Sequence, residues 1–316
     1  MSKVSIISER RMNNNIVCVY ILTHNRPQCI QGCIESVLNQ SFENYIVCVS
    51  DNSDNDETER ILSSLVEMHE NLLYVHHKNL SNSYDHFMHI INTNTYEYYM
   101  LFHDDDQMMP RMVETLYRNL AKSDGIAAIG SNAVLKIDGK TTSIKFNKNK
   151  GILICGGQEL IECYSRGKYS PYPSYMYRKS KIDGLKPQLE HGGKYSDVSY
   201  LVDIAFKGNI CILPDVLMYY NISSLQDSYA FDFLSHIKLT NYLIRLSGSK
   251  VVLGLRLFHI YLGAIEGYNK GTMLFRKRVL ILLFSNYKYG YFYKYIARYI
   301  QSKLYSLENS YHRFTI

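Results

Sequence analysis

The chain has 316 residues, of which 46% are hydrophobic and 20% are charged, a balance that is ordinary for a globular protein with a sizeable core in one large or two smaller domains. Its seven cysteines include no CxxC pair, and the polar first 15 residues contain Arg10-Arg11 without an apolar stretch. We therefore expect reduced thiols and no export signal, which excludes a disulfide-stabilised secreted domain.

The net charge of +6 is unevenly distributed along the chain. From Lys250 onward there are 11 Lys and Arg against two acids, whereas the first 249 residues carry a net charge of −3. The basic character therefore belongs to the C-terminal part.

Apolar runs of strand length alternate with segments of helical periodicity through the first hundred residues. The expected strands are 16–22, 45–50, 72–75 and 98–102, and the expected helices begin near Pro27, Thr58 and Phe87. This alternation predicts a parallel sheet with right-handed crossovers. Neither GxGxxG nor GxxxxGK[ST] follows the first strand. A bound nucleotide would therefore be held through its base, its ribose and a metal rather than by a glycine loop.

Two of the expected strands end in acid-rich segments, residues 51–56 (DNSDND) and 104–106 (DDD). The carboxyl ends of parallel strands are where open α/β sheets bind ligands. Three adjacent carboxylates repel one another unless a cation joins them, and an all-oxygen site favours Mg²⁺ or Mn²⁺. The alternative is a solvated acidic loop without a ligand.

The next part of the chain continues the α/β pattern. A helix to about Lys122 precedes a buried strand at 125–129, a hairpin or mobile loop at 136–150, and an aromatic loop and strand at 169–178. Residues 192–199 (GGKYSDVS) precede an amphipathic helix, and strands are expected at 209–213 and 217–223.

From about residue 228 the pattern becomes helical and basic. The apolar stretches 251–265 and 279–284 are too short to span a bilayer. Tyr, Phe, Lys and Arg interleave between residues 287 and 303, which suits a helix lying in a membrane interface with anionic headgroups. The alternative is a helical cap that packs on the rest of the protein. No recognised nucleic-acid motif is present, so we expect no nucleic-acid partner.

Four motifs, in order, resemble those of the family 2 glycosyltransferases, which are inverting nucleotide-sugar enzymes of GT-A fold. The motifs are residues 23–27 (THNRP), residues 34–42 (IESVLNQSF), residues 49–53 (VSDNS), and residues 103–106 (HDDD) with Pro110. The resemblance covers about residues 15–225. His103 stands where many relatives have the first acid of the DxD motif.

The resemblance implies roles for residues at these positions. Asp51 would bind the base and ribose of the donor, Asp104 the ribose, and Asp105 and Asp106 a Mn²⁺ or Mg²⁺ ion. The other expected donor-binding residues are Thr23, Asn25 and Arg26.

The family's catalytic base usually belongs to a Glu-Asp pair before a late helix. Here that place reads Tyr195-Ser196-Asp197, so Asp197 is the candidate base, with Glu190 and His191 as neighbouring alternatives that could also bind the acceptor. Asp197 could instead serve as a helix N-cap. Tyr175 and Tyr177 of the aromatic loop are candidates for stacking on a sugar, although an ordinary core loop is comparably plausible.

The resemblance and the basic tail together imply an organisation and an activity. We expect a polar segment (1–15), a GT-A catalytic domain (16–227) with a nucleotide-binding half (16–106) and an acceptor half (107–227), and a helical membrane-associating region (228–316). The expected reaction moves a sugar from a UDP-sugar to a polyprenyl-diphosphate-linked saccharide. It would occur in the cytoplasm, at the inner membrane face, in O-antigen or capsule synthesis. The alternatives are a metal-dependent nucleotide-sugar hydrolase and a non-catalytic membrane-bound partner in an assembly complex.

Overall fold

The computed structural model describes residues 16–80, 82–165, 167–222 and 232–247. The chain divides into two compact units, one comprising Met1–Pro187 and Tyr200–Phe231, the other Gln188–Ser199 and Asp232–Ile316. Residues 188–199, which the sequence analysis placed in the catalytic domain, thus group with the C-terminal part. The segments 1–15, 251–265, 279–284 and 287–303, for which the sequence analysis made predictions, lie outside the described residues.

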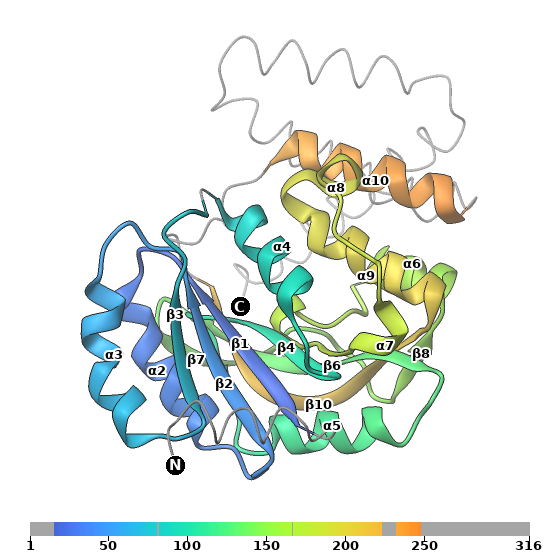
Figure 1. The fold of residues 1–316 in the computed structure, drawn as a ribbon. Helices are drawn as coiled ribbons and strands as arrows, with labels where there is room; N and C mark the ends of the chain where they lie inside the picture. The colour runs from blue at the N-terminus through green and yellow to red at the C-terminus, as the bar shows by residue number, and fades with distance from the viewer. Residues whose placement is uncertain (1–15, 81, 166, 223–231, 248–316) are drawn as a thin grey trace, which may run out of the picture. The chain divides into compact units, whose positions relative to one another are not determined.

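The first unit contains a mixed sheet in which ten strands take part, in the order β3-β2-β1-β4-β9-β6-β10-β5, with β7 beside β6 and β8 beside β10 (Figure 1). The strands are β1 (Val17–Thr23), β2 (Tyr45–Asp51), β3 (Leu72–His76), β4 (Tyr98–His103), β5 (Gln107–Met108), β6 (Ile126–Ile137), β7 (Lys140–Lys145), β8 (Leu153–Cys155), β9 (Met176–Arg178) and β10 (Asn209–Ile222). The predicted parallel core is confirmed for β3-β2-β1-β4, and β6 pairs with β10 in parallel.

The register of the parallel core brings three polar strand ends together. Thr23 lies beside Asp51 on β2, and Leu22 lies beside His103 on β4. Because parallel strands end at the same edge of a sheet, the loops after β1, β2 and β4 meet there. The two acid-rich segments therefore flank the end of β1.

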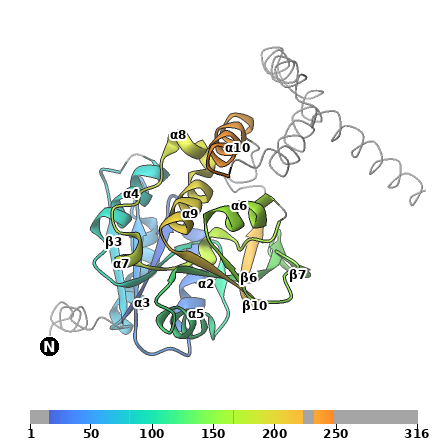
Figure 2. The same cartoon turned by 90° about the vertical axis from the view of Figure 1, so that its right-hand side faces the viewer.

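Helices cover both faces of this sheet (Figures 1 and 2). Helices α2 (Pro27–Leu38), α3 (Glu57–Met68) and α5 (Met112–Ala121) lie on one face; α4 (Ser83–Thr93), α6 (Gly157–Ser165) and the end of α9 (Ser196–Lys207) lie on the other. The short helices η1 (Tyr172–Ser174) and α7 (Lys179–Ile182) flank β9. This placement of α2 and α3 opposite α4 follows from right-handed crossovers, since the chain moves outward from β1 to β3 and then returns to β4.

Helix α2 illustrates how the sequence determines local structure. Pro27 is its first residue, a position where the missing N–H costs no hydrogen bond. Ile30, Cys33, Ile34 and Val37 are all buried, and their spacing places them on one helical face against the sheet. The N-terminus of α2 consequently begins four residues after the end of β1.

Two regions of the β6–β10 half differ from simple parallel strands. The predicted hairpin at 136–150 is confirmed as β6 and β7, whose turn uses positive φ at Asp138 (46°) and Gly139 (78°). The two strands expected at 209–213 and 217–223 form one long strand, β10, with register irregularities around Pro214. Proline donates no ladder hydrogen bond, which accounts for an interruption at this point.

The described part of the second unit contains α8 (Leu189–Gly192), η2 (Gly193–Tyr195), the first residues of α9, and α10 (Phe233–Ser247). Its segments are joined by a stack of the His191 and Tyr242 rings, 3.8 Å between centroids, and by a 2.9 Å hydrogen bond from the Lys194 backbone N–H to Ser235 Oγ. None of the described helices combines the length and the apolar character that crossing a bilayer requires.

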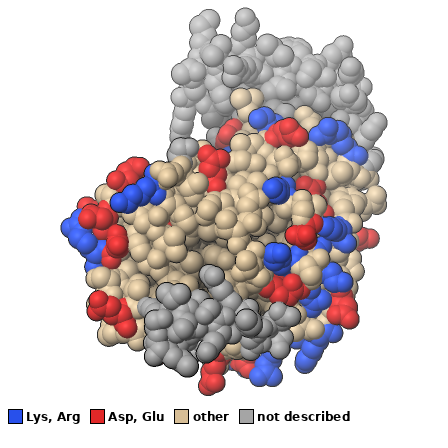
Figure 3. Space-filling model, in the orientation of Figure 1, with Lys and Arg blue, Asp and Glu red and all other residues tan. Residues whose placement is uncertain are grey.

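Charged side chains on the visible face of the first unit are intermixed. In Figure 3, Lys and Arg alternate with Asp and Glu around a central area of uncharged residues. On this face, the described residues form no extended basic stripe of the kind that binds a nucleic-acid backbone.

Candidate functional site

The loop after β2 is held by its own buried carboxylate. Asp51 is fully buried, and its Oδ1 accepts a 2.8 Å hydrogen bond from the Ser53 backbone N–H. Its Oδ2 accepts a 2.8 Å bond from the Tyr74 hydroxyl on β3. Burial and this hydrogen bond raise the pKa of the Tyr74 phenol. Asp51 therefore fixes the shape of the loop in which the sequence analysis expected it to bind the donor base.

Asn25 connects the loop after β1 to the loop after β2. It adopts a left-handed φ of 53°, a conformation that asparagine tolerates better than most residues. Its backbone N–H donates to Ser53 Oγ (2.7 Å), its Nδ2 donates to Asp54 Oδ2 (2.8 Å), and its Oδ1 accepts from the Asp54 backbone N–H (3.0 Å). The expected donor-pocket residue thus acts as a brace between two loops.

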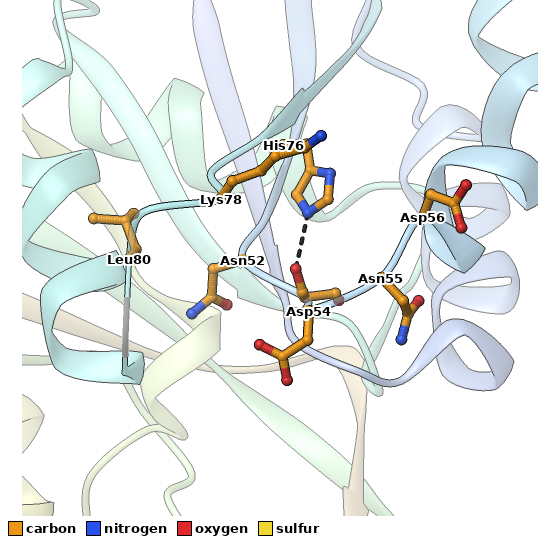
Figure 4. Close-up of a pocket in the computed structure, with 8 residues that line it drawn as sticks. Asn52, Asp54, Asn55, Asp56, His76, Lys78 and Leu80 are labelled. Carbon is orange, nitrogen blue, oxygen red and sulfur yellow. Dashed lines mark hydrogen bonds between the residues drawn. The ribbon is translucent and has the colours of Figure 1, made fainter.

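A cavity of about 440 Å³ opens beside these loops, at the ends of β2 and β3 (Figure 4). It is lined by Asn52, Ser53, Asp54, Asn55, Asp56, His76, Lys78 and Leu80. The lining is predominantly polar, with hydrogen-bonding groups of several kinds. Such a cavity suits a polar ring with donors and acceptors on its edge better than an apolar ligand.

Two buried polar groups in the cavity lining have no partner among the described residues. Asn52 is 3% exposed, and neither its Oδ1 nor its Nδ2 is hydrogen-bonded. His76 Nε2 donates to the Ser53 carbonyl at 2.8 Å, so that Nδ1 is left as an acceptor, buried and without a partner (Figure 4). Because unpaired buried polar groups are costly, both indicate a binding surface.

The loop after β4 buries its first carboxylate against β1 and α2. Thr23 Oγ1 donates to Asp104 Oδ2 at 2.6 Å, and Arg26 Nη2 lies 2.5 Å from Asp104 Oδ1. Burial nevertheless raises the pKa of Asp104 to about 7, since the loss of hydration outweighs the attraction of Arg26. Arg26 also contacts Asp105, with 3.1 Å between Nη1 and Oδ2.

The remaining side chains of this loop converge on a small volume. His103, Asp105 and Asp106 each place one nitrogen or oxygen atom within 4.8 Å of the other two. Asp106 is 1% exposed; its Oδ1 accepts from the Asn221 backbone N–H at 2.8 Å, and its Oδ2 has no partner among the described residues. Burial, and the neighbouring Asp105, raise the pKa of Asp106 well above its usual range. This set fits a divalent cation, which would satisfy the unpaired carboxylate oxygen.

The cavity and the carboxylate cluster are connected through β1. The Asn52 backbone N–H donates to the Thr23 carbonyl at 3.2 Å, and the Thr23 hydroxyl binds Asp104. His24 Nδ1 donates to the Asn52 carbonyl at 2.9 Å. One rigid strand end therefore positions both features at the same edge of the sheet.

The aromatic loop does not present the tyrosines that the sequence analysis proposed for sugar stacking. Tyr175 and Tyr177 are fully buried, and their ring centroids are 6.4 Å apart in a tyrosine cluster with Tyr99 and Tyr200. Burial raises the pKa of Tyr200 to about 12. In the described structure these rings belong to the core, which was the alternative interpretation of the loop.

The other candidate residues lie in the second unit. Asp197 is in the first turn of α9, and burial raises its pKa to about 6 against the opposing hydrogen bond from the Val198 backbone N–H. Glu190 is exposed and lies 3.7 Å from His191 Nε2, whose ring stacks on Tyr242. Asp197 thus has an environment suited to accepting a proton near neutral pH.

Comparison with known proteins gives the family. The model of glycosyl transferase family 2 matches residues 18–181, slightly more than half of the chain, including both acid-rich loops. The chain belongs to glycosyltransferase family 2. No curated protein matches it significantly.

Solved structures show the same fold at low sequence identity. Staphylococcus aureus TarS 1–349 in complex with UDP aligns with a TM-score of 0.60 at 12% identity, over 83% of this chain and 77% of that chain. Its complex with UDP-GlcNAc aligns equally well, with 78% of that chain covered. The mannosyltransferase PcManGT from Pyrobaculum calidifontis, in complex with GDP-Man and Mn²⁺, aligns with a TM-score of 0.51 at 12% identity, over 89% of this chain and 83% of that one. This glycosyltransferase therefore has the GT-A fold.

The sequence analysis missed several polar residues of this glycosyltransferase. Asn52, His76 and Lys78 line the cavity, and no sequence signal distinguishes them from ordinary loop residues. His103 was noticed only as a departure from the DxD motif, although its position beside three acids was itself a signal for a nitrogen ligand.

Proposed function

We propose that this glycosyltransferase transfers a sugar from a UDP-sugar to a polyprenyl-diphosphate-linked saccharide. The reaction would take place at the inner face of the cytoplasmic membrane and serve bacterial surface polysaccharide synthesis, such as O-antigen or capsule. The proposal is carried by one observation. A polar cavity with unpaired buried groups lies at the ends of β2 and β3, and a carboxylate cluster that a cation would stabilise lies after β4, at the same edge of the sheet.

The two features match the two ends of a nucleoside diphosphate. The amide of Asn52 offers N–H donors beside a carbonyl acceptor, an arrangement that complements the imide edge of uracil. At the other end, Asp105 and Asp106 would hold a Mn²⁺ or Mg²⁺ ion, and Arg26 already contacts the same loop. Solved relatives hold UDP, UDP-GlcNAc, or GDP-Man with Mn²⁺, which supports a donor of this class.

The chemistry follows from charge development on the leaving group. When bound, the metal stabilises the negative charge that grows on the departing diphosphate. The Arg26 guanidinium would bind a diphosphate oxygen in addition to its two carboxylates. Thr23 would hold the loop after β4 in place, and Asn25 the loop after β2, so that little reorganisation is needed during the reaction.

Asp197 is the proposed general base. It would accept the proton of the acceptor hydroxyl as that oxygen attacks the anomeric carbon from the face opposite the diphosphate. A pKa of about 6 keeps it ionised at neutral pH and still able to take a proton. A single displacement inverts the anomeric configuration, so an α-linked donor would give a β-linked product.

A membrane-bound acceptor is supported by the composition of the C-terminal part. The excess of Lys and Arg after residue 250, interleaved with tyrosines between 287 and 303, suits an anionic bilayer surface. Glu190 and His191 are proposed acceptor-side residues because they share a segment with Asp197. Tyr175 and Tyr177 are not proposed for this role, because both are buried.

A donor screen tests the proposal. Purified full-length protein, Mn²⁺ and a synthetic lipid-diphosphate GlcNAc or GalNAc acceptor would be incubated with UDP-, GDP- and dTDP-sugars, and the product read by mass. We expect one hexose or deoxyhexose increment, with a UDP-sugar as the donor. An increment from a GDP- or dTDP-sugar alone would contradict the choice of nucleotide.

The same assay separates the two alternatives. A hydrolase would release free sugar faster in the absence of acceptor than it transfers sugar in its presence. A non-catalytic partner would give neither product and would bind UDP weakly, with or without Mn²⁺.

A further inference from the structure

The imidazole of His103 is positioned beside the carboxylate cluster without a hydrogen-bonding role of its own. Its backbone carbonyl accepts from Cys33 Sγ (3.3 Å) and from the Asp106 backbone N–H (3.4 Å). Its ring, by contrast, makes no hydrogen bond to any described residue, and its aromatic neighbour, the Tyr172 ring, is 6.5 Å away between centroids. The backbone is therefore fixed while a ring nitrogen is left available.

The same nitrogen belongs to the group of atoms that could surround a cation. One ring nitrogen of His103 and one oxygen each of Asp105 and Asp106 lie within 4.8 Å of one another. Ligand bonds of about 2.1–2.2 Å place cis ligands about 3 Å apart and a trans pair about 4.4 Å apart. The three groups are therefore close enough for side-chain rotations to bring them onto one ion.

A second observation points to a ligand at this place. Asp106 Oδ2 is buried and has no partner among the described residues, while Oδ1 is held by the Asn221 backbone N–H. The carboxylate is thus oriented from β10 on one side and unsatisfied on the other. A buried carboxylate oxygen in this state is what a cation would satisfy.

We propose that His103 is a nitrogen ligand of the metal in this glycosyltransferase, together with Asp105 and Asp106, and that this nitrogen makes the site select Mn²⁺ over Mg²⁺. The inference rests on the proposed function and adds the third ligand and the ion preference. Mg²⁺ strongly favours oxygen ligands in regular octahedral geometry. Imidazole is a better ligand for transition-metal ions, so replacing an acid by histidine shifts the preference toward Mn²⁺.

Pulsed EPR of bound Mn²⁺ tests the ligand directly. Full-length protein would be loaded with Mn²⁺ and UDP, and the nitrogen coupling recorded for protein with natural histidine and with ¹⁵N-histidine. We expect a ¹⁴N coupling that is replaced by a ¹⁵N coupling in the labelled protein. This comparison needs no variant, so it does not depend on whether a substitution folds. Bound Mn²⁺ without a histidine nitrogen coupling would overturn the inference and leave the proposed function standing.

Calorimetry with the metal alone tests the ion preference. We expect the wild-type protein to bind Mn²⁺ on the order of tenfold or more tighter than Mg²⁺, and His103→Asp to reduce this ratio by about tenfold while removing the nitrogen coupling. His89→Gln, at a histidine outside the cluster, should leave both unchanged. An unchanged ratio in His103→Asp would contradict the ion preference. Failure of the wild type to bind either ion, with or without UDP, would overturn the proposed function as well.

Discussion

Two loops that look alike in sequence do different things in this protein. The loop after β2 (51–56) and the loop after β4 (104–106) both begin with aspartate at the end of a buried strand. In the first, Asp51 is satisfied by the Ser53 backbone N–H and the Tyr74 hydroxyl, and the acids that follow are exposed. In the second, Asp104 and Asp106 are buried, and Asp106 keeps one oxygen unpaired.

The difference shows that partners and burial, rather than the number of acids, decide what an acidic loop can do. A satisfied buried carboxylate fixes the loop, and exposed acids are solvated. A bound cation gives a large stabilisation only to carboxylates that are buried without enough hydrogen-bond donors. The β2 loop is therefore a scaffold beside the cavity, and the β4 loop is the metal-binding candidate.

Replacing the proposed metal-binding carboxylate of Asp106 should give the largest effect. We expect Asp106→Asn to lower sugar transfer by about 10²–10³-fold, because an amide is a poor metal ligand and the diphosphate loses its stabilisation. Initial rates at saturating Mn²⁺ would measure the loss. Asp124→Asn, at a fully exposed acid, is the matched control and should retain activity. Wild-type rates in Asp106→Asn would remove the distinction between the two loops.

The stability of the protein in acid tests the contact between β2 and α4, next to the β2 loop. His86 Nε2 lies 2.7 Å from Ser50 Oγ, and burial lowers the pKa of His86 to about 4. The folded protein therefore favours the neutral ring, and this contribution is present above pH 6.5 and is lost as the pH falls toward 4. We expect the loss to be about 3 kcal/mol in the free energy of unfolding. Denaturant unfolding at pH 7 and 4.5 should show a shallower decline for His86→Gln, and identical slopes would contradict the assignment.

Substitution of Asn52 should give an effect of intermediate size, in which thermal stability and UDP affinity change in opposite directions. Replacing the unpaired amide in Asn52→Leu should raise the thermal midpoint by a few degrees, since an unpaired buried amide costs about 1–3 kcal/mol. The same change should weaken UDP binding by about tenfold. Asn94 is equally buried, but its amide is hydrogen-bonded to Tyr20 and Tyr96.

Asn94→Leu is therefore the control for that experiment. It should lower the thermal midpoint and leave UDP binding unchanged. If Asn52→Leu behaved in the same way, Asn52 would be an ordinary structural residue and the cavity would lose its proposed contact with the base.

The smallest effect is expected at the exposed end of the β2 loop. Arg60 and Asp56 form an ion pair of 3.0 Å, with both side chains about two-thirds exposed. Exposed ion pairs contribute little to the free energy of unfolding because water screens the two charges. Arg60→Ala should move the midpoint by no more than about 1 °C. A larger shift in a thermal scan would show that the outer acids of this loop also stabilise the structure.

Much of the nucleotide-binding half could be predicted from the sequence because its signals are local. The apolar runs of β1, β2 and β4 are mostly buried strands, and Pro27 marks the start of α2. The position of β9 could not be predicted in this way. It inserts antiparallel between β4 and β6, a pairing between segments about 50 to 80 residues apart for which no local pattern exists.

The same limit applied to the site. Asp104 to Asp106 were identified from their place after a strand, but which oxygen is unpaired depends on Asn221, more than 100 residues away. Nothing in the sequence indicates that the Asn52 amide lacks hydrogen-bond partners. The sequence of the loop that contains Tyr175 and Tyr177 fits equally well with rings that face a sugar and rings that face the core. Only the packing against Tyr99 and Tyr200 shows that the rings belong to the core.

The most direct test of the account is a calorimetric titration of UDP into the full-length protein, with Mn²⁺ and again with a chelator. If the cavity holds the base and the β4 loop holds a metal ion that binds the diphosphate, Mn²⁺ should tighten UDP binding by at least about tenfold. Equal affinity in the two conditions would contradict the account, because the β4 carboxylates would then have no part in donor binding.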